Sequence, residues 1–291
     1  MTMQSLPDSL HFGSLNEPLW IEFDRRIGHY SMKSNHYHLA YELFYLLSGE
    51  RNYFIKDSVY RVYPGDLMLV ESNVVHKTSE LSRPNHERVV VHYSPSFFDG
   101  FAPEDKRLLQ LPFTGGHPHV RLNLQERMHI EALFGSMLHE LYERPHGYLL
   151  HIRNMAVELL LFTARLMMKR NDQPCDELSP IQEKVTAIVR HINTHFGEPL
   201  HLDELAKQFF ISKSHLSRVF KEVTGFGFSE FVNIARIREA ERLLRETDLG
   251  ITQISETCGF ENFSHFGKMF KKLSGVSPRA YRQAMKPSGR N

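Results

Sequence analysis

The region from Ile181 to the carboxyl end contains one sequence pattern twice, and this repeat constrains the fold more than any other feature. The stretch ELAKQFFISKSHLSRVFKEVTGFGFSEFV aligns with QISETCGFENFSHFGKMFKKLSGVSPRAYR. Matching residues stand fifty positions apart: His215 and His265, Phe220 and Phe270, Lys221 and Lys271, Gly225 and Gly275, Phe231 and Tyr281. Self-similarity of this kind indicates two copies of one supersecondary unit.

Each copy predicts a short helix, a tight turn and a longer helix. The short helices are expected at Leu202–Gln208 and Ile251–Thr257. Ser212 and Asn262 are suitable N-caps for the longer helices, and the glycines at 225 and 275 are suitable helix stops. This arrangement describes a helix-turn-helix. The segment FSEFVNIARIREAERLLRET between the copies predicts one amphipathic helix that fixes their separation.

The longer helices have one apolar face and one polar or basic face. The buried stripe is predicted to consist of Leu216, Val219, Phe220 and Val223 in the first copy, and of Phe266, Met269, Phe270 and Leu273 in the second. The outward residues are then Ser214, Ser217, Arg218 and Lys221, and Ser264, Lys268, Lys271 and Lys272. Any amphipathic helix has a solvated face, but basic residues at matching positions of two copies favour DNA. Membrane binding fits poorly, because the aromatic residues recur at core spacing.

Charge is distributed unevenly along the chain. Residues 1–180 carry 18 Lys+Arg against 22 Asp+Glu, whereas residues 181–291 carry 17 against 12. A basic tail behind a mildly acidic front suggests that the tail meets a polyanion. With 41% hydrophobic and 24% charged residues, the 291-residue chain is typical of a soluble protein of two domains.

Residues 181–291 closely resemble the DNA-binding domain of the AraC/XylS family of bacterial transcription regulators. LSRVFKEVTGFGFSEFVNIARIREAERLL and ISETCGFENFSHFGKMFKKLSGVSPRAYR match its signature. The resemblance implies that the two long helices read base edges in the major groove. It assigns base contacts to Ser214, Ser217, Arg218, Phe263, Ser264 and Lys268, and phosphate contacts to Lys213, Lys221 and Lys271. Ser255, where alanine is usual, and Gly267, where a small polar residue is common, depart from the family pattern.

The sequence pattern in the front of the chain predicts short strands. YELFYLLSG, RNYFIKDS, VYRVYPGD, LMLVESN and RVVVHYS are separated by turn residues, which favours a β-barrel or sandwich. Residues 97–122 are expected to be irregular. Two helices follow, in NLQERMHIEALFGSMLHELYER and YLLHIRNMAVELLLFTARLMMKR, separated by Pro145-His146-Gly147. The spacing places Leu124, Met128, Phe134, Leu138 and Leu141 on one apolar face of the first helix.

These patterns predict an α+β multidomain chain. We expect a cupin-like sensing domain at 1–122, a dimerising helical pair at 123–170, a linker at 171–180 and the AraC-type DNA-binding domain at 181–291. The second helix of the pair is apolar around much of its circumference, so one of its surfaces is a candidate homodimer interface.

Histidines in the front domain resemble the metal-binding frame of cupin barrels. His36, His38, Glu42 and Gly49 precede a PGD at 64–66 and a later His76. Imidazole and carboxylate ligands suit Fe, Mn, Ni or Zn. Sensor domains of the AraC family carry the same frame, and the resemblance implies a small organic effector there. We therefore expect an effector site at His36, His38, Glu42, Phe44 and His76, with no cofactor and no metal, although the two His of the HxH, Glu42 and His76 are candidate metal ligands.

The chain is thus expected to be a non-enzymatic, ligand-responsive regulator of DNA. The family favours an activator of a metabolic operon, with sugar as one candidate effector and RNA polymerase as a candidate partner. The alternatives are a metal-dependent cupin enzyme with a DNA-binding tail, and a constitutive regulator with a purely dimerising front domain. The cysteines Cys175 and Cys258 lie far apart, and neither a signal peptide nor a membrane span is evident, which predicts a cytoplasmic protein.

Overall fold

The chain divides into two compact units in the computed structural model, which describes residues 6–14, 17–28, 38–80, 84–169 and 180–285. The first unit spans Met1–Glu177 and the second spans Leu178–Asn291. Residues 170–179 lie outside the described residues, so the linker expected at 171–180 stays a prediction. Among the residues that are described, no helix has both the length and the apolar character that a membrane span requires.

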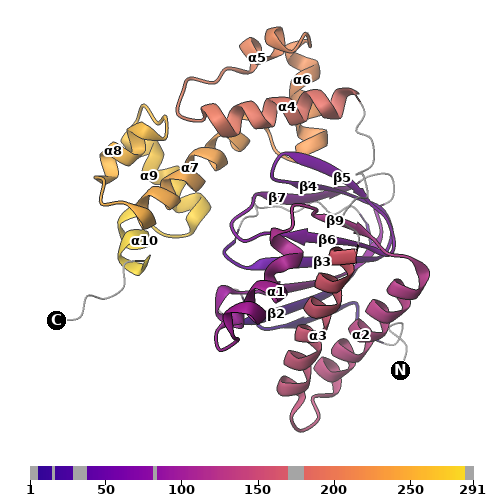
Figure 1. Ribbon diagram of the computed structural model, residues 1–291. Helices are drawn as coiled ribbons and strands as arrows, with labels where there is room; N and C mark the ends of the chain where they lie inside the picture. Colours follow the sequence, from indigo (N-terminus) through magenta and orange to yellow (C-terminus); the bar gives the residue numbers. More distant parts are fainter. Residues whose placement is uncertain (1–5, 15–16, 29–37, 81–83, 170–179, 286–291) are drawn as a thin grey trace, which may run out of the picture. The chain divides into compact units, whose positions relative to one another are not determined.

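Two antiparallel sheets form the framework of the first unit (Figure 1). The six-stranded sheet has the order β1 (Ser9–Phe12), β2 (Leu19–Arg26), β8 (His86–Tyr93), β3 (Tyr41–Ser48), β6 (Asp66–Val70) and β9 (His119–Arg121). The three-stranded sheet has the order β5 (Ser58–Val62), β4 (Arg51–Ile55) and β7 (His76–Glu80). The strands expected in the five apolar runs of the front domain are confirmed, and with them the α+β fold class.

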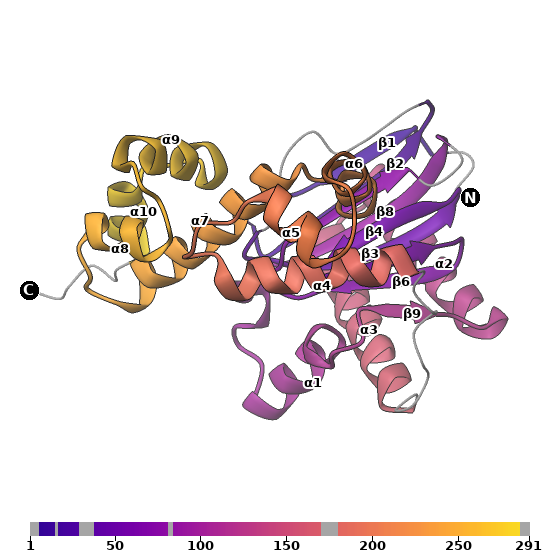
Figure 2. The same cartoon turned by 90° about the horizontal axis from the view of Figure 1, so that it is seen from above.

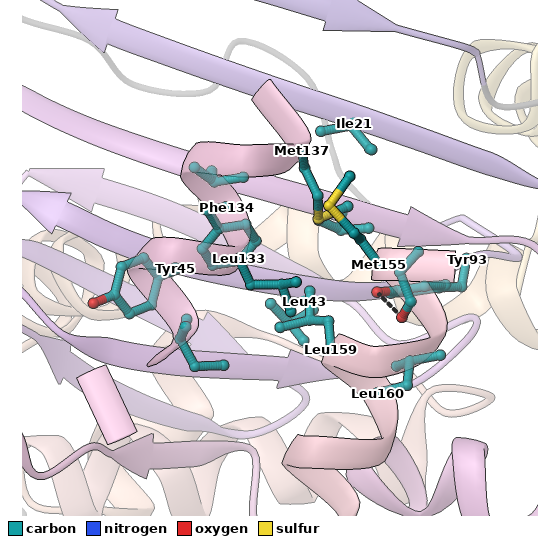
Figure 3. Packing of buried hydrophobic residues seen from close by; sticks show 14 of the residues in the cluster. Ile21, Leu43, Tyr45, Tyr93, Leu133, Phe134, Met137, Met155, Leu159 and Leu160 are labelled. Atoms are coloured by element: carbon teal, nitrogen blue, oxygen red, sulfur yellow. Dashed lines mark hydrogen bonds between the residues drawn. The ribbon is translucent and has the colours of Figure 1, made fainter. Parts of the chain in front are cut away.

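Strand β3 divides its side chains between two cores, because successive residues of a strand point to opposite faces. Leu43 and Tyr45 belong to the core that the large sheet shares with the helices (Figure 3). Phe44 and Leu46 belong to a second core, which contains residues of both sheets. Glu42 has the same parity as Phe44, so its carboxyl group lies in the interior between the sheets.

The described part of the first unit also has a short 3-10 helix, Pro95–Phe98, and three α-helices: α1 (Pro103–Thr114), α2 (Leu124–Glu143) and α3 (Tyr148–Lys169). The expectation of an irregular segment at 97–122 is wrong, because α1 and β9 occupy most of it. A proline opens α1 at its first turn, where a missing N–H costs nothing, and Leu109 and Phe113 are buried. A second proline, Pro112, lies in the last turn of the helix.

The helices α2 and α3 pack against each other and share one apolar core with the large sheet. Figure 3 shows Phe134 and Met137 of α2 beside Met155 and Leu159 of α3. The structure places this pair in the same compact unit as the sheets, and its boundary as a separate dimerising segment stays a prediction.

The apolar face predicted for α2 is only partly buried. Leu124 and Met128 are 75% and 65% exposed, whereas Phe134, Leu138 and Leu141 are buried. The first two side chains lie in the first two turns of α2, where the core that the helix shares with α3 and the sheet does not reach them.

The second unit is entirely helical in its described residues. Its helices are α4 (Pro180–His195), α5 (Leu202–Gln208), α6 (Lys213–Thr224), α7 (Phe228–Glu246), α8 (Ile251–Thr257), α9 (Phe263–Ser274) and α10 (Pro278–Met285). Helices α4, α5 and α6 pack near the start of α7, and α8, α9 and α10 pack around its far end (Figures 1 and 2). The bounds of both short helices agree with the sequence prediction.

The sequence repeat corresponds to a structural repeat. Ser212 accepts a hydrogen bond from the backbone N–H of His215 at 3.3 Å, and Asn262 accepts the equivalent bond from His265 at 3.0 Å. Both longer helices end at a left-handed glycine, with φ 76° at residue 225 and 77° at residue 275. The aromatic pair Phe220–Phe231, with ring centroids 5.7 Å apart, recurs as Phe270–Tyr281 at 5.5 Å, and both pairs are edge-to-face. The predicted caps and aligned aromatic residues are therefore confirmed.

Candidate functional site

The outward face of α6 is polar and basic. The helix buries Leu216, Val219 and Phe220 against the rest of its unit, as its spacing predicts. The opposite face exposes Ser214, Ser217, Arg218 and Lys221. Seven-tenths of the Arg218 side chain is exposed, and its Nε lies 3.8 Å from the carboxylate Oε1 of the exposed Glu222. Such a surface ion pair is weak, so the guanidinium is available to an incoming ligand.

Lys213, at the start of α6, pairs with a residue of the preceding helix. Its Nζ lies 3.3 Å from Oδ1 of Asp203, and both side chains are largely exposed. Because water competes for both groups, a phosphate could replace the carboxylate at little cost. Lysine near a helix N-terminus, where backbone N–H groups point outward, is a common phosphate-binding arrangement.

The outward face of α9 is more strongly basic. Lys268, Lys271 and Lys272 are exposed on it, and Ser264 is exposed in its first turn. Phe263, the first residue of the helix, is half exposed, unlike the buried Phe266 and Phe270 of the same helix. Gly267 lies between these groups, and a Cβ atom built on it would meet no other atom. All nine residues expected to contact DNA are therefore exposed on these two helices.

A second cluster of candidate site residues lies between the sheets of the first unit. The Nε2 atoms of His38, His76 and His92 lie 3.2, 3.1 and 3.0 Å from the same carboxylate oxygen, Oε2 of Glu42. The hydroxyl of Tyr53 donates a short hydrogen bond to the other oxygen, Oε1. All of these side chains are at least nine-tenths buried. We call the group of His38, Glu42, His76 and His92 the imidazole–carboxylate cluster.

Sheet register brings the cluster together. His92 of β8 lies directly opposite Glu42 of β3, and Trp20 of β2 lies directly opposite His92. The rings of Trp20 and His92 stack with centroids 4.1 Å apart. Tyr53 and His76 come from β4 and β7 of the other sheet.

The charge of Glu42 is stabilised in spite of its burial. Burial alone would raise the pKa of this carboxyl group, but the neighbouring His76 charge and the imidazole hydrogen bonds hold it well below its usual value. Burial lowers the pKa of His76, but the Glu42 carboxylate outweighs this effect and raises it. For His92 burial prevails and lowers the pKa. Burial and the Glu42 charge raise the pKa of Tyr53, so its hydroxyl remains a donor.

The structure brings together three of the five residues expected at the effector site: His38, Glu42 and His76. Phe44 is buried in the same interior, where its ring meets Tyr53 edge-to-face. His36 lies outside the described residues. Sequence reasoning missed His92 and Tyr53. The alternation of β8 gave one signal, because His92 has the parity of the inward-facing Val90.

Comparison with known proteins accounts for both units. The AraC-like ligand binding domain matches residues 22–153, and a helix-turn-helix domain matches residues 205–284. The chain belongs to the AraC family. It is a ligand-responsive transcription regulator with a DNA-binding helix-turn-helix region.

Individual relatives extend over most of the chain. The transcriptional activator RhaS of Escherichia coli is 25% identical over 252 residues, which cover 85% of this chain and 87% of RhaS, and RhaS of Shigella sonnei gives the same values. Among solved structures, ToxT from Vibrio cholerae is 17% identical, covers 93% of this AraC-family chain and 100% of its own, and has a TM-score of 0.38. At this TM-score the likeness adds nothing to the assignment.

Proposed function

We propose that this AraC-family regulator inserts α6 and α9 into successive major-groove segments on one face of its operator. The observation that supports this most is the structural repeat, in which two like helices bury aromatic residues and expose polar and basic ones. Helix α7 connects the two helix-turn-helix copies and has 19 residues. At about 1.5 Å per residue it is about 28 Å long, comparable with the ~34 Å repeat of B-DNA.

Base recognition is assigned to residues near the start of each helix. In α6 these are Ser214, Ser217 and Arg218, and in α9 they are Phe263, Ser264 and Lys268. Arginine donates two hydrogen bonds to O6 and N7 of guanine, which discriminates against other bases by about 1–3 kcal/mol. Phosphate contacts are assigned to Lys213, Lys221 and Lys271, and phosphate contacts fix the register without reading sequence.

Arg218→Ala tests this assignment. Operator sites are first selected from a random DNA pool with the full chain, and affinities are then measured by mobility shift on operator and single-base variants. We expect Arg218→Ala to lose preference at one base position, whereas Lys271→Ala should weaken all sequences alike and lower the salt slope by about one.

Arg242→Ala is the matched control, because Arg242 lies on α7 and pairs with Glu239 and Glu246. Its affinity for DNA should remain that of the unchanged chain. An Arg218→Ala variant that binds operator and random DNA with equally reduced affinity would show that Arg218 contacts phosphate only.

The effector is proposed to bind in the interior of the first unit, at His36, His38, Glu42, Phe44 and His76. A population shift would transmit the signal, since a ligand changes an equilibrium only by binding one state better than the other. No catalytic role is assigned, and the polar and aromatic lining is compatible with a sugar. By analogy with the activator RhaS we propose activation of a metabolic operon, contact with RNA polymerase and a cytoplasmic location.

A homodimer is proposed to form through α2 and α3. These helices expose apolar side chains even though they already share a core with the sheet: Leu124, Met128, Leu149, Leu150 and Met168 are each more than half exposed. Sedimentation of the full chain should show a dimer, and Leu150→Glu should shift it toward the monomer. The variant Ile27→Glu is the control, because Ile27 is also exposed (80%) but lies outside these helices.

A further inference from the structure

The hydrogen bonds around Glu42 leave a place for a cation. Nδ1 of His38 lies 2.9 Å from the carbonyl oxygen of Ala40, and Nδ1 of His76 lies 2.8 Å from that of Val74. A carbonyl oxygen only accepts hydrogen bonds, so each Nδ1 carries a proton. In a neutral ring the lone pair on Nε2 then points at the Glu42 carboxylate, which is itself an acceptor.

This orientation is that of histidines which bind a metal. A ligating histidine almost always donates its other ring N–H to a backbone carbonyl or a carboxylate, which fixes the tautomer and directs the lone pair. His38 and His76 both show this arrangement. Tyr53 supplies a further support, because its hydroxyl holds Oε1 of Glu42 and turns Oε2 toward the imidazoles.

The distances suit a metal ion. The donor atoms of His38, Glu42 and His92 lie within 4.8 Å of one another, and among the described residues they form the one such group of three. Metal–ligand bonds of about 2.0–2.1 Å place neighbouring ligands of a tetrahedron about 3.3 Å apart. The three distances from Nε2 atoms to Oε2 of Glu42 are 3.2, 3.1 and 3.0 Å. The spacing of His38, Glu42 and His92 is therefore compatible with one ion held between them.

Packing of the ring, and not a hydrogen bond at Nδ1, holds His92 in place. Its ring stacks on Trp20 at an interplanar angle of 16°. Its Nδ1 is buried and has no hydrogen-bond partner in the described residues. Once an ion takes the place of the hydrogen bond between Nε2 and Glu42, the ring can carry its proton on Nδ1 and present a lone pair on Nε2 without breaking a further hydrogen bond.

We propose that the imidazole–carboxylate cluster binds one divalent transition-metal ion through Nε2 of His38 and His92 and the carboxylate of Glu42, while His76 positions that carboxylate through its own hydrogen bond. Two imidazoles and one carboxylate suit Zn²⁺, Fe²⁺, Co²⁺ or Ni²⁺ better than Mg²⁺ or Ca²⁺, which prefer oxygen ligands. The sequence favoured an organic effector over a metal in this frame. The geometry adds a metal ion to this frame and His92 to its ligands, so that the proposed effector would bind beside the ion and not in its place.

A second buried histidine provides an internal contrast. Nε2 of His119 lies 3.0 Å from Oδ2 of Asp66, and both side chains are buried. There Arg121 supplies a cation directly, with its Nε 3.1 Å from Oδ1 of the same aspartate. His119→Gln therefore removes a buried histidine of the same domain, next to a carboxylate, without touching the proposed ligands.

The test uses the full chain, stripped with a chelator and titrated with Co²⁺ and Zn²⁺ under calorimetry and visible absorption. We expect one ion per chain, with a Co²⁺ spectrum typical of nitrogen and oxygen ligands. Glu42→Gln and His92→Gln should lose this binding, whereas His119→Gln should keep it. Tyr53→Phe should weaken it by about 10–100-fold, as the loss of a supporting hydrogen bond does.

The unchanged chain keeps the proposal open to refutation even if a variant fails to fold. A stripped, folded chain that takes up no Co²⁺, Zn²⁺, Ni²⁺ or Fe²⁺ above the level of its Glu42→Gln variant overturns the metal site. So does an ion retained by both Glu42→Gln and His92→Gln. Operator binding is measured on the same samples, and its loss in every sample would instead contradict the proposed DNA contacts.

Discussion

The two helix-turn-helix units share one arrangement of helices but differ in the length and the residues of the turn between their two helices. In both, the short helix ends in a Schellman-type motif, in which a backbone N–H bonds to a carbonyl five residues earlier. These bonds run from Ile211 to Ala206 and from Phe260 to Ser255, at 2.9 and 3.0 Å. The turn between helices has four residues in the first unit, 209–212, and five in the second, 258–262. The same hydrogen-bond pattern thus forms in turns of two different lengths.

The left-handed position of this motif holds different residues. The second unit uses Gly259, with φ 78°, whereas the first uses Phe210, with φ 55° and a side chain that is 91% exposed. A left-handed conformation costs a residue with a Cβ roughly 1–2 kcal/mol. The first unit therefore contains a local strain that the second avoids, and Phe210 gains no burial in return.

At the buried residue whose carbonyl accepts the Schellman bond, one helical turn earlier, it is the second unit that has the less favourable residue. Here the first unit has Ala206, and the second has Ser255, which is 1% exposed. The Ser255 hydroxyl has no hydrogen-bond partner in the described residues. Each unit thus contains one energetically unfavourable residue in this motif, Phe210 in the first unit and Ser255 in the second.

The largest expected effect comes from Gly259→Ala. Besides the positive φ, a Cβ atom there would lie 2.8 Å from the carbonyl oxygens of Gly197 and Phe196. Strain and overpacking together should lower the free energy of unfolding by about 2–4 kcal/mol. Urea unfolding followed by helical circular dichroism measures this, since the single tryptophan, Trp20, lies in Met1–Glu177 and does not report on the helix-turn-helix units.

Gly275→Ala is the control for backbone strain alone. Its φ of 77° is nearly the same, but a Cβ atom there would meet nothing within 4 Å. This variant should lose only about 1–2 kcal/mol. Equal losses in the two variants would mean that the contact with the 196–197 backbone does not constrain residue 259.

Ser255→Ala should stabilise the second unit by about 1–2 kcal/mol, because it removes a buried hydroxyl without a partner. The reciprocal change Ala206→Ser should destabilise the first unit by a similar amount. Both are measured by the same urea transitions. If Ser255→Ala lowers stability, the hydroxyl has a partner, such as a buried water, and the contrast between the units disappears.

Phe210→Gly should stabilise the first unit by about 1 kcal/mol through relief of the left-handed strain. Phe210→Ala keeps a Cβ atom at the same backbone angle and should change stability by less than about 0.5 kcal/mol. Hydrogen exchange of the α5 and α6 amides separates this effect from the rest of the chain. Equal gains in both variants would point to the exposed ring, not the backbone, as the cause.

The repeat could be predicted residue by residue because its signals are local. Caps at Ser212 and Asn262 and glycines at helix ends act within four residues of the bonds they make, so the bounds of α5 and α8 follow from the sequence. Nothing in the sequence predicted that Phe210 adopts the left-handed conformation that Gly259 adopts in the other unit. A positive φ at phenylalanine becomes visible only when the turn is folded.

The imidazole–carboxylate cluster was only partly predictable because its contacts are not local. His38 and Glu42 are four residues apart, so their spacing in the sequence was enough to suggest one site, although His38 precedes β3, which begins at Tyr41. His92 reaches Glu42 through the β3–β8 register, and Tyr53 through the packing of two sheets. Neither relation can be read without knowing which strands pair. The α1 helix was missed as well, because residues 97–122 were expected to be irregular.

Gly267→Ala has the smallest expected effect and separates stability from recognition. Residue 267 corresponds to Ser217 in the first unit, and a Cβ atom there would meet open space. Alanine in place of a mid-helix glycine should stabilise α9 by about 0.8–1 kcal/mol. If the gap beside Lys268 only weakens the helix, affinity for the operator should be unchanged or slightly higher. If DNA approaches the backbone closely at residue 267, the added methyl group should instead lower affinity while stability rises. Urea unfolding and mobility shifts on one preparation distinguish these outcomes, and Ser217→Ala in α6 shows what loss of a hydroxyl does at the equivalent place.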